Sequence, residues 1–392
     1  MNVPVIVDAI RSPMGRAKSD GALVKVHPVD LLSQVLEQLV SRNKIDPNEV
    51  DDVICGCVTQ GGEQSGTPGR LAWLAAGLPQ HVPSTTIDRK CGSSQQAVHF
   101  AAHTIMAGAQ DIVIACGVES MSRVPMGSAR MGMNATGERF DKRYEPGLVG
   151  QGVSADLISA KWNLTRNELD SFSARSHALA HKAQSSGNFK REIVGITTPS
   201  GNVNEDDTIR PGTTVEKLAS LKAVFGNDEL SARFPQIEWR TTAGNSSQIT
   251  DGAAAMLIMS ERRAVKLGLR PRARFVAFDV VGDDPLYMLT APMPATRRIL
   301  AKSGMKLDDI QHYEINEAFA SVPLAWQKEM KADAERLNPR GGAIALGHPL
   351  GASGVRLMTT MLHALEDNNY RYGLQSMCEA GGMANATIIE RL

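Results

Sequence analysis

Length, composition and charge set the first limits on this protein. The chain has 392 residues, and its 42 Lys and Arg residues balance 42 Asp and Glu residues, so the formal net charge is zero at pH 7. A chain of this length exceeds what one hydrophobic core usually supports, so we expect at least two core units. The neutral composition argues against nucleic acid as a partner and against a polybasic membrane-binding patch.

Neither a secretory signal nor a membrane span is visible in the sequence. Residues 1–13 enter a short apolar strand directly, without a basic region. No apolar run approaches the roughly 18 residues that cross a bilayer. The five cysteines include no C-x-x-C pair, which argues against a disulfide framework and against structural zinc. We therefore expect a cytoplasmic protein with no membrane insertion, no bound metal and no permanently bound cofactor.

The first 120 residues alternate short apolar strands with longer helical stretches, which is typical of α/β folds. In chain order, the pattern predicts a strand at 3–7, a helix at 30–40, a strand at 53–57, helices at 69–77 and 95–106, and a strand at 111–116.

The texture changes in the middle of the chain. It is first rich in Met, Gly and Arg without periodicity, and then contains polar helices such as 166–185. A structureless loop of that length would be unusual in a compact unit, so we interpret 121–248 as an inserted loop domain. After it, the order of strand, helix and glycine-rich corner repeats that of the first part. The sequence therefore predicts two similar halves of the βαβαβαββ type, residues 1–120 plus 249–269 and residues 270–392.

The stretch IDRKCGSSQQAVHFAAHTI (87–105) places Cys91 between the end of a strand and the first turn of a buried helix. Unpaired backbone N–H groups and the positive end of the helix dipole favour an anion there. We therefore expect Cys91 to have a lowered pKa and to act as a nucleophile. A small apolar core residue is the alternative that this stretch alone leaves open.

Three further corners carry reactive residue types. His348 stands between glycines in GGAIALGHPLGASG, Cys378 ends a strand in SMCEAGG, and Asn316 and Glu317 interrupt an apolar junction in EINEAFA. Taken singly, each has a structural alternative: a histidine that caps a loop, a core thiol, and a buried amide that hydrogen-bonds the backbone. If the two halves face each other, these strand ends meet Cys91 at one central site.

Together these motifs resemble the thiolase family, and the resemblance runs nearly from end to end. It is carried by RSPMGR, KCGSSQQA, GVESMS, TTAGNSSQITDGAAA, NEAFA, GGAIALGHPLGASG and MCEAGG. The resemblance implies a thiolase-like fold. It also implies CoA-dependent cleavage of 3-ketoacyl-CoA to acetyl-CoA and a shortened acyl-CoA, as in fatty-acid β-oxidation, and the reverse Claisen condensation.

The resemblance also implies a role for each matching residue. Cys91 would accept the acyl group, His348 would take its proton, and Cys378 would move the α-proton as the second acid and base. Asn316, through a water, and His348 would hold the enolate oxygen. The backbone N–H groups of Cys91 and Ala380 would hold the oxygen of the acylating group.

Coenzyme A and acyl-CoA are expected as substrates, and a homodimer or homotetramer as the assembly. Ser247 matches the serine that contacts the pantetheine arm in this family. Further candidates for CoA contacts are Ala243, Ala318, Lys222 and Arg210.

The chain departs from the family pattern at three places. Ala380 and Ser94 stand where glycines are usual, and Ala380 would be strained if its φ were positive. Residues 150–152 (GQG) replace a His-Met-Gly run common in acetoacetyl-CoA enzymes. We therefore favour longer or bulkier 3-ketoacyl-CoA substrates. A group of methionines could line such a pocket, although loop packing is favoured: Met121, Met126, Met131 and Met133.

Three other interpretations of the sequence are open. One is a short-chain acetoacetyl-CoA thiolase, which the same site chemistry would serve. Another is a decarboxylating ketoacyl synthase, which pairs its cysteine with two histidines or with a histidine and an asparagine, so that Cys378 argues against it. The third, a non-catalytic acyl-CoA or lipid carrier, predicts loss of Cys91, His348 or Cys378, and all three are present.

Overall fold

The protein is described by a computed structural model that covers residues 2–392. Its strands are β1 (Pro4–Arg11), β2 (Gly15–Arg16), β3 (Asp52–Gly56), β4 (Ser84–Ile87), β5 (Ile112–Ser120), β6 (Ile196–Thr198), β7 (Gly201–Val203), β8 (Thr250–Ser260), β9 (Ala273–Gly282), β10 (His312–Ile315), β11 (Tyr372–Glu379) and β12 (Met383–Arg391).

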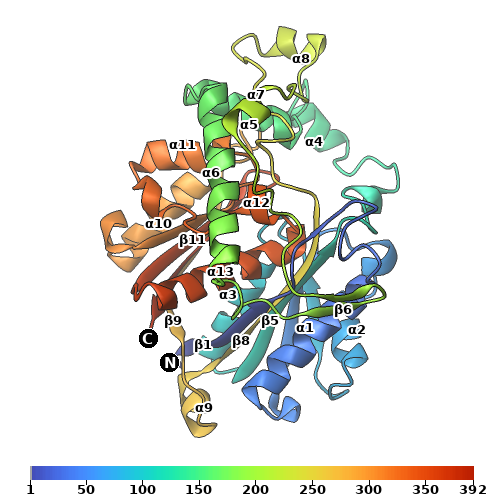
Figure 1. Cartoon of the computed structure of the whole chain (residues 1–392), viewed down its shortest axis with the longest axis vertical. Helices are drawn as coiled ribbons and strands as arrows, with labels where there is room; N and C mark the ends of the chain where they lie inside the picture. The colour runs from blue at the N-terminus through green and yellow to red at the C-terminus, as the bar shows by residue number, and fades with distance from the viewer. Residues whose placement is uncertain (1) are drawn as a thin grey trace.

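Helices cover both halves of the sheet (Figure 1). They are α1 (Pro28–Asn43), α2 (Pro68–Ala75), α3 (Ser93–Met106), α4 (Glu138–Arg143), α5 (Gln151–Lys161), α6 (Arg166–Ser185), α7 (Val215–Ala219), α8 (Asp228–Arg233), α9 (Glu261–Lys266), α10 (Pro292–Ser303), α11 (Ser321–Met330), α12 (Ala343–Leu346) and α13 (Ser353–Asp367). No helix within residues 2–392 has both the length and the apolar character needed to cross a membrane.

The sheet repeats one strand order in the two halves of the chain. The first half runs β3-β5-β8-β1 and the second runs β10-β11-β12-β9, with one parallel pair followed by two antiparallel pairs in each. A short β1–β9 pairing, Val5 with Arg274 and Ile6 with Ala273, joins both into one sheet. The predicted α/β fold of two similar halves is confirmed, with β4 as an additional edge strand of the first half.

Two helices, α3 and α13, pack against each other between the two halves. Their apolar side chains share one core cluster with those of β1, β5, β8 and β12. In α13 every residue from Ser353 to Leu365 is buried, so this helix has no solvent face. Each helix begins directly after a corner predicted to be reactive. The packing of α3 on α13 therefore brings the corners of the two halves together.

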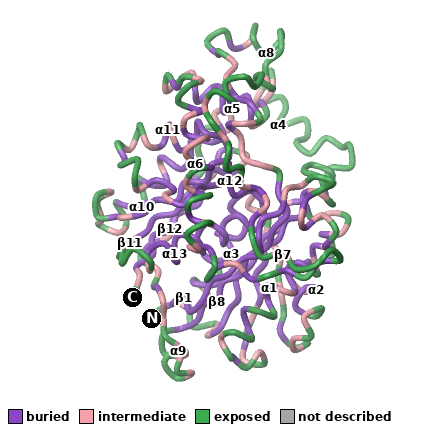
Figure 2. The backbone as a smooth tube through the Cα atoms, in the orientation of Figure 1, coloured by how far each residue is buried: buried purple, intermediate pink, exposed green. Residues whose placement is uncertain are grey.

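Residues 121–248 leave the first half between β5 and β8 and carry α4 to α8 and the β6–β7 hairpin. Figure 2 shows that exposed backbone gathers along this segment, whereas the sheet is buried. The long helix α6 begins at a capping box formed by Thr165 and Glu168. From α6, the hydroxyl of Ser176 donates to Glu317 (2.7 Å), so the inserted segment reaches the second half beside Asn316.

Candidate active site

Four predicted residues meet where the two halves face each other. Cys91 lies just before α3, Cys378 near the end of β11, His348 between α12 and α13, and Asn316 directly after β10. All four are buried. The amide Nδ2 of Asn316 lies 3.4 Å from His348 Nε2, and Cys91 packs in one small cluster with Leu350, two residues after His348, and with Met377, one residue before Cys378.

Hydrogen bonds fix the orientation and the tautomer of His348. The Ser353 hydroxyl donates its one proton to the Pro349 carbonyl (2.8 Å), so its oxygen accepts a hydrogen bond from His348 Nδ1–H (2.7 Å). The proton of the neutral imidazole therefore stands on Nδ1, and Nε2 keeps its lone pair. Burial and the charge of Arg356 lower the pKa of His348 to about 3, so the ring is neutral at pH 7.

The expected lowering of the Cys91 pKa is wrong for the resting protein. Burial first, and then the nearby carboxylate of Glu379, raise its pKa to about 12. The backbone N–H groups of Cys91 and Ala380 hydrogen-bond the sulfur and lower its pKa, but they do not offset the loss of hydration. Cys91 therefore rests as a thiol and His348 as a neutral imidazole, and a thiolate forms only when the proton of the thiol is transferred.

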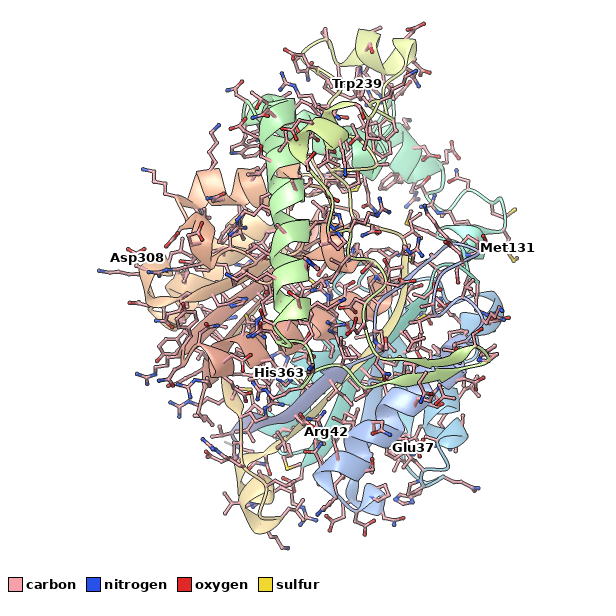
Figure 3. The ribbon with its side chains drawn as sticks, viewed as in Figure 1. Glu37, Arg42, Met131, Trp239, Asp308 and His363 are labelled. Carbon is pink, nitrogen blue, oxygen red and sulfur yellow. The ribbon has the colours of Figure 1, made fainter. Side chains whose placement is uncertain are left out.

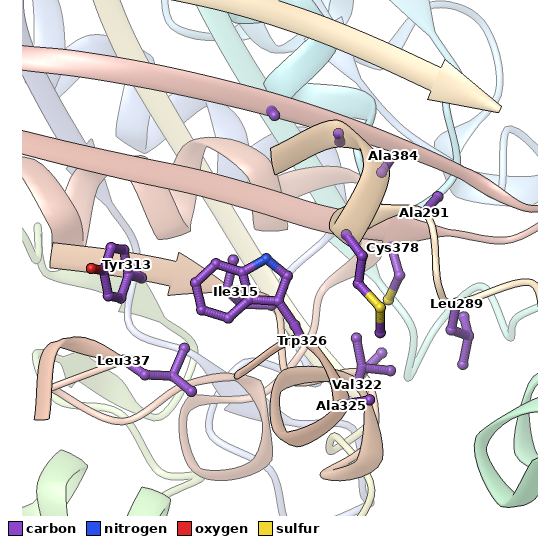
Figure 4. Packing of buried hydrophobic residues seen from close by; sticks show 14 of the residues in the cluster. Leu289, Ala291, Tyr313, Ile315, Val322, Ala325, Trp326, Leu337, Cys378 and Ala384 are labelled. Atoms are coloured by element: carbon purple, nitrogen blue, oxygen red, sulfur yellow. The ribbon is translucent and has the colours of Figure 1, made fainter. Parts of the chain in front are cut away.

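Cys378 is the more deeply enclosed of the two thiols. It belongs to the core cluster of the second half, and Figure 4 shows it among the side chains around Trp326 and Val322. Burial, Cys91 and Glu379 raise its pKa. Such a thiol holds its proton at neutral pH and can donate it to a stronger base, such as a carbanion.

Two features of this site bear on stabilisation of negative charge. The Oδ1 atom of Asn316 is buried without a hydrogen-bond partner, so it is free to hold a water or a substrate group. The N–H groups of Cys91 and Ala380 both point at the Cys91 sulfur. Among residues 2–392, Ala380 is absent from the non-glycine residues with positive φ, whereas Gly381 and Gly382 have φ of 95° and 79°. Alanine at position 380 is therefore unstrained.

Ser94, which stands where glycine is usual, makes a hydrogen bond between the two central helices. It is buried at the start of α3, and its Oγ accepts the backbone N–H of Val355 in α13 (3.0 Å). This bond joins the two central helices directly behind the site.

Glu119, at the end of β5, is a structural residue of the site that the sequence did not reveal. Its two carboxylate oxygens accept the backbone N–H groups of Val58, Thr59 and Gly351 and the side-chain amide of Gln64, at 2.9–3.0 Å. Through Gly351, the loop of the second half that carries the histidine is tied to the first half. The only signal in the sequence was an acid at the end of an apolar strand, in GVES.

A cavity of about 490 Å³ lies next to the loop that carries the histidine: Gln248 lines the cavity, and its carbonyl accepts the His348 N–H (3.1 Å). None of the four site residues lines this cavity. Three of the predicted CoA contacts line it: Ala243, Ser247 and Arg210. Lys222 is exposed and does not line it, and Ala318 lies behind it, where its carbonyl accepts the Ser247 N–H (2.9 Å).

Sequence reasoning missed two basic residues at this cavity, Arg16 and Lys18, although Arg16 is the last residue of RSPMGR, one of the stretches that carry the family resemblance. Between them, Ala17 lines the cavity and also packs against the small apolar cluster around Cys91. A residue of the cavity lining between two basic side chains therefore touches the cluster that contains the thiol.

The space expected at residues 150–152 is occupied at Gly152, whereas a Cβ on Gly150 would meet nothing within 4 Å. A Cβ on Gly152 would stand 2.3 Å from the ring of Phe225, so this glycine makes room for a side chain of the insertion. Met121 packs with Cys91, but three other methionines are 59%, 83% and 73% exposed: Met126, Met131 and Met133. Figure 3 shows Met131 projecting from the surface, so these three do not line a pocket within the chain.

Comparison with known proteins shows the family of the chain. A family model of the thiolase N-terminal domain matches residues 4–262, and one of the thiolase C-terminal domain matches residues 269–391. A steroid 3-ketoacyl-CoA thiolase of Mycobacterium tuberculosis is 47% identical, over 100% of this chain and 95% of that protein. A 3-ketoacyl-CoA thiolase of Pseudoalteromonas translucida is 41% identical, over the full length of both.

A solved structure has the same fold. The crystal structure of the Bacillus anthracis acetyl-CoA acetyltransferase superimposes with a TM-score of 0.88 at 39% sequence identity, over 100% of this chain and 99% of that one. The matches cover both halves and the insertion between them. The chain therefore belongs to the thiolase family.

Proposed function

We propose that this protein is an acyltransferase that cleaves 3-ketoacyl-CoA with CoA, giving acetyl-CoA and an acyl-CoA shortened by two carbons, and that also catalyses the reverse condensation. The observation that carries the proposal is the meeting of two thiols, a neutral histidine and a half-satisfied asparagine amide in one buried site. The names of relatives at 41% and 47% identity support the same reaction.

In the first step, Cys91 attacks the C3 carbonyl carbon while its proton passes to Nε2 of His348. The C2–C3 bond then breaks, and its electron pair leaves with C2 as the enolate of acetyl-CoA. Cys378 donates its proton to that carbon, which releases acetyl-CoA and leaves the acyl group on Cys91. In the second step, the thiol of CoA gives its proton to the Cys378 thiolate and attacks the acyl-cysteine; the bond between the acyl carbon and the Cys91 sulfur breaks, the sulfur takes its proton back from His348, and the shortened acyl-CoA leaves.

Two sets of donors are placed to hold the negative charges of these steps. The N–H groups of Cys91 and Ala380 meet at the sulfur, next to the oxygen of the tetrahedral intermediate. A water on Asn316 Oδ1 and His348 would serve the enolate oxygen. Each donor of this kind is worth about 3 kcal/mol of barrier.

The cavity beside the site suits the CoA moiety. Its lining at Ala243, Gly244, Ser246 and Ser247 consists of small side chains, which leave room for a narrow pantetheine arm, and the two serines carry hydroxyl groups that can bond to its amides. Lys18 and Arg210 are exposed at the rim. Their charges would attract the phosphates of CoA.

The acyl group is the less determined part of the substrate. We propose 3-ketoacyl chains longer than acetoacetyl, which the names of the relatives support. A short-chain acetoacetyl-CoA thiolase is the second candidate. It is favoured by the Phe225 ring, which fills the space beside Gly152, and by the name of the structural neighbour.

The test is a series of CoA-dependent thiolysis rates from acetoacetyl-CoA to long-chain and steroid-side-chain 3-ketoacyl-CoA esters, with Cys91→Ala as the blank. Rates that rise with chain length and vanish in the blank would support the first candidate. Turnover of acetoacetyl-CoA alone would select the second. Turnover that persists in the blank would contradict Cys91 as the nucleophile, and absence of any turnover would contradict the proposal as a whole.

We also propose a homodimer or homotetramer in the cytoplasm, with three parts: residues 1–120 plus 249–269, the insertion 121–248, and residues 270–392. The break between the two family models at 262–269 supports the last boundary. Three exposed methionines on one loop support assembly through the insertion: Met126, Met131 and Met133. Light scattering would decide between monomer, dimer and tetramer.

A further inference from the structure

The carboxyl group of Glu379 lies inside the site without a role in the reaction described above. Glu379 ends β11, directly after Cys378, and it is fully buried. Its Oε1 accepts the backbone N–H of Asn385 in β12 (3.1 Å), whereas its Oε2 is buried without a partner. Glu379 forms no salt bridge with any residue in the described range 2–392. A buried carboxylate in this position would be an uncompensated charge.

The side chain of Glu379 packs against the residue that follows the nucleophile. A Cβ on Gly92 would stand 1.9 Å from Glu379 Oε1 and 3.0 Å from Asn385 Oδ1. Only glycine fits there. The Asn385 Oδ1 atom is itself buried without a donor. Two acceptor oxygens, Glu379 Oε1 and Asn385 Oδ1, therefore both face Gly92 with no donor between them. A proton on the carboxyl group of Glu379 would supply a donor and remove the repulsion between them.

We propose that Glu379 works in its protonated, uncharged form, and that its ionisation disfavours the Cys91 thiolate and so limits the nucleophile at high pH. Glu379 is in this sense a positioning residue, because it acts on the reaction through Cys91. The proposal rests on Cys91 as the nucleophile of the proposed function. It adds a group that sets the charge state of the site.

The surroundings of Glu379 offer little positive charge. The charged and titratable groups on the elements around it are Asp88, Arg89 and Lys90 before α3; Cys91, His99 and His103 at or within α3; Lys302 of α10, near His99; and Cys378 of β11. Asp88 and Lys90 pair with each other (2.6 Å).

Burial dominates the ionisation of Glu379. Burial lowers the pKa of His99 to about 3, so this ring carries no charge at pH 7. Arg89 attracts the carboxylate, but burial outweighs it and raises the pKa of Glu379 to about 8. In turn, the charge on Glu379 raises the pKa of Cys91 and of Cys378. By reciprocity, a thiolate on Cys91 would in turn oppose the ionisation of Glu379.

The coupling predicts a bend in the reactivity of Cys91. Far below its pKa, a thiol gains tenfold in thiolate for each pH unit, so the logarithm of its alkylation rate rises with a slope of about one. As Glu379 ionises near pH 8, the thiolate becomes harder to form, so the rise flattens there. With glutamine at position 379, the rise should continue without the bend. Above the bend, Glu379→Gln should therefore react on the order of tenfold faster than the wild type.

The experiment measures alkylation of Cys91 by iodoacetamide between about pH 6 and about pH 10, followed on the peptide that contains Cys91. The wild type is compared with Glu379→Gln and with Cys91→Ala as the blank. Glu390→Gln is the matched control, because Glu390 lies at the far end of the same β11–β12 hairpin and is paired with Arg274 and Arg371. This control should keep the wild-type bend.

A second variant keeps the test decisive if Glu379→Gln fails to fold. Arg89→Gln removes the attraction that lowers the pKa of Glu379, so the bend should move to higher pH. A straight line in the wild type, a bend that survives in Glu379→Gln, or a bend that Arg89→Gln leaves in place would overturn the proposal. Alkylation needs no acyl-CoA, so failure here is distinct from failure of the proposed thiolysis.

Discussion

Replacing Ser353 with alanine tests whether the tautomer of His348 is set by one hydroxyl group. In the wild type, the oxygen of Ser353 accepts the Nδ1–H of His348 at 2.7 Å while its proton is donated to the Pro349 carbonyl at 2.8 Å. Alanine removes both bonds and leaves a buried Nδ1–H without an acceptor. The proton is then free to move to Nε2, and in that tautomer His348 cannot receive the proton of Cys91.

The size of the effect follows from the cost of an unsatisfied buried donor. Leaving such a group unpaired costs about 1–3 kcal/mol. If this cost falls on the reactive tautomer, kcat should decrease about 5- to 150-fold. KM for the acyl-CoA should stay within about twofold, because the hydroxyl of Ser353 is buried behind the ring and away from the cavity.

The assay is steady-state thiolysis of acetoacetyl-CoA and of the best longer substrate, together with thermal unfolding. Ser173→Ala in α6 is the matched control, because Ser173 is also buried and also donates to the carbonyl four residues earlier (2.8 Å), but within residues 2–392 its hydroxyl makes no hydrogen bond to a histidine. It should lose similar stability and keep its kcat. A kcat of Ser353→Ala within about twofold of the wild type would refute the reasoning, since the tautomer would then need no hydroxyl.

Three further changes probe the surroundings of the site. Glu119→Gln turns one acceptor into a donor that faces backbone N–H groups, including that of Gly351, so thermal unfolding should show a loss of about 2–4 kcal/mol; an unchanged melting temperature would contradict this. Gly152→Ala places a methyl group 2.3 Å from the Phe225 ring, so KM should rise at constant kcat if that ring borders the substrate, and unchanged kinetics would exclude the contact. Because the folded-state pKa of Glu379 lies above its unfolded value, the stability from this group is full below pH 4.5 and is lost as pH rises to about 8. Urea unfolding should therefore show Glu379→Gln gaining on the wild type by on the order of 1.4 kcal/mol per pH unit across this window, and a constant difference would contradict it.

The sequence predicted the corners of the site but not its electrostatics. Cys91 and His348 could be predicted because glycines and small residues flank them in the sequence, and this local pattern is visible without knowledge of the fold. The pKa of Cys91 could not be predicted from the sequence. Its position before a helix favours a low pKa, whereas burial and the carboxylate of Glu379, which is distant in sequence, raise the pKa to about 12. In the same way, the glycine at 152 suggested open space, and Phe225, a residue from another part of the insertion, fills it.

The lining of the CoA cavity shows the same limit. Ser247 was predicted from the stretch GNSSQ, and Arg210 as a basic residue of the insertion. Arg16 and Lys18 belong to a different part of the chain, the segment after β1 that includes β2. No periodicity links these segments. They meet because β2, which contains Arg16, pairs with β8 at Thr250. A strand pairing between distant segments determines which basic residues reach the rim, and only the fold reveals it.

The charge state of the resting site is consistent with the reaction proposed for it. Cys91 and Cys378 rest as thiols and His348 as neutral imidazole, so the site has no charge of its own from these groups. Every negative charge of the reaction then arises on substrate or sulfur, where N–H groups already point and where little water competes. A fixed carboxylate beside these donors would oppose each such charge. The neutral form of Glu379 avoids that cost, and this is why its ionisation, rather than that of the thiols, should define the upper pH limit of the nucleophile.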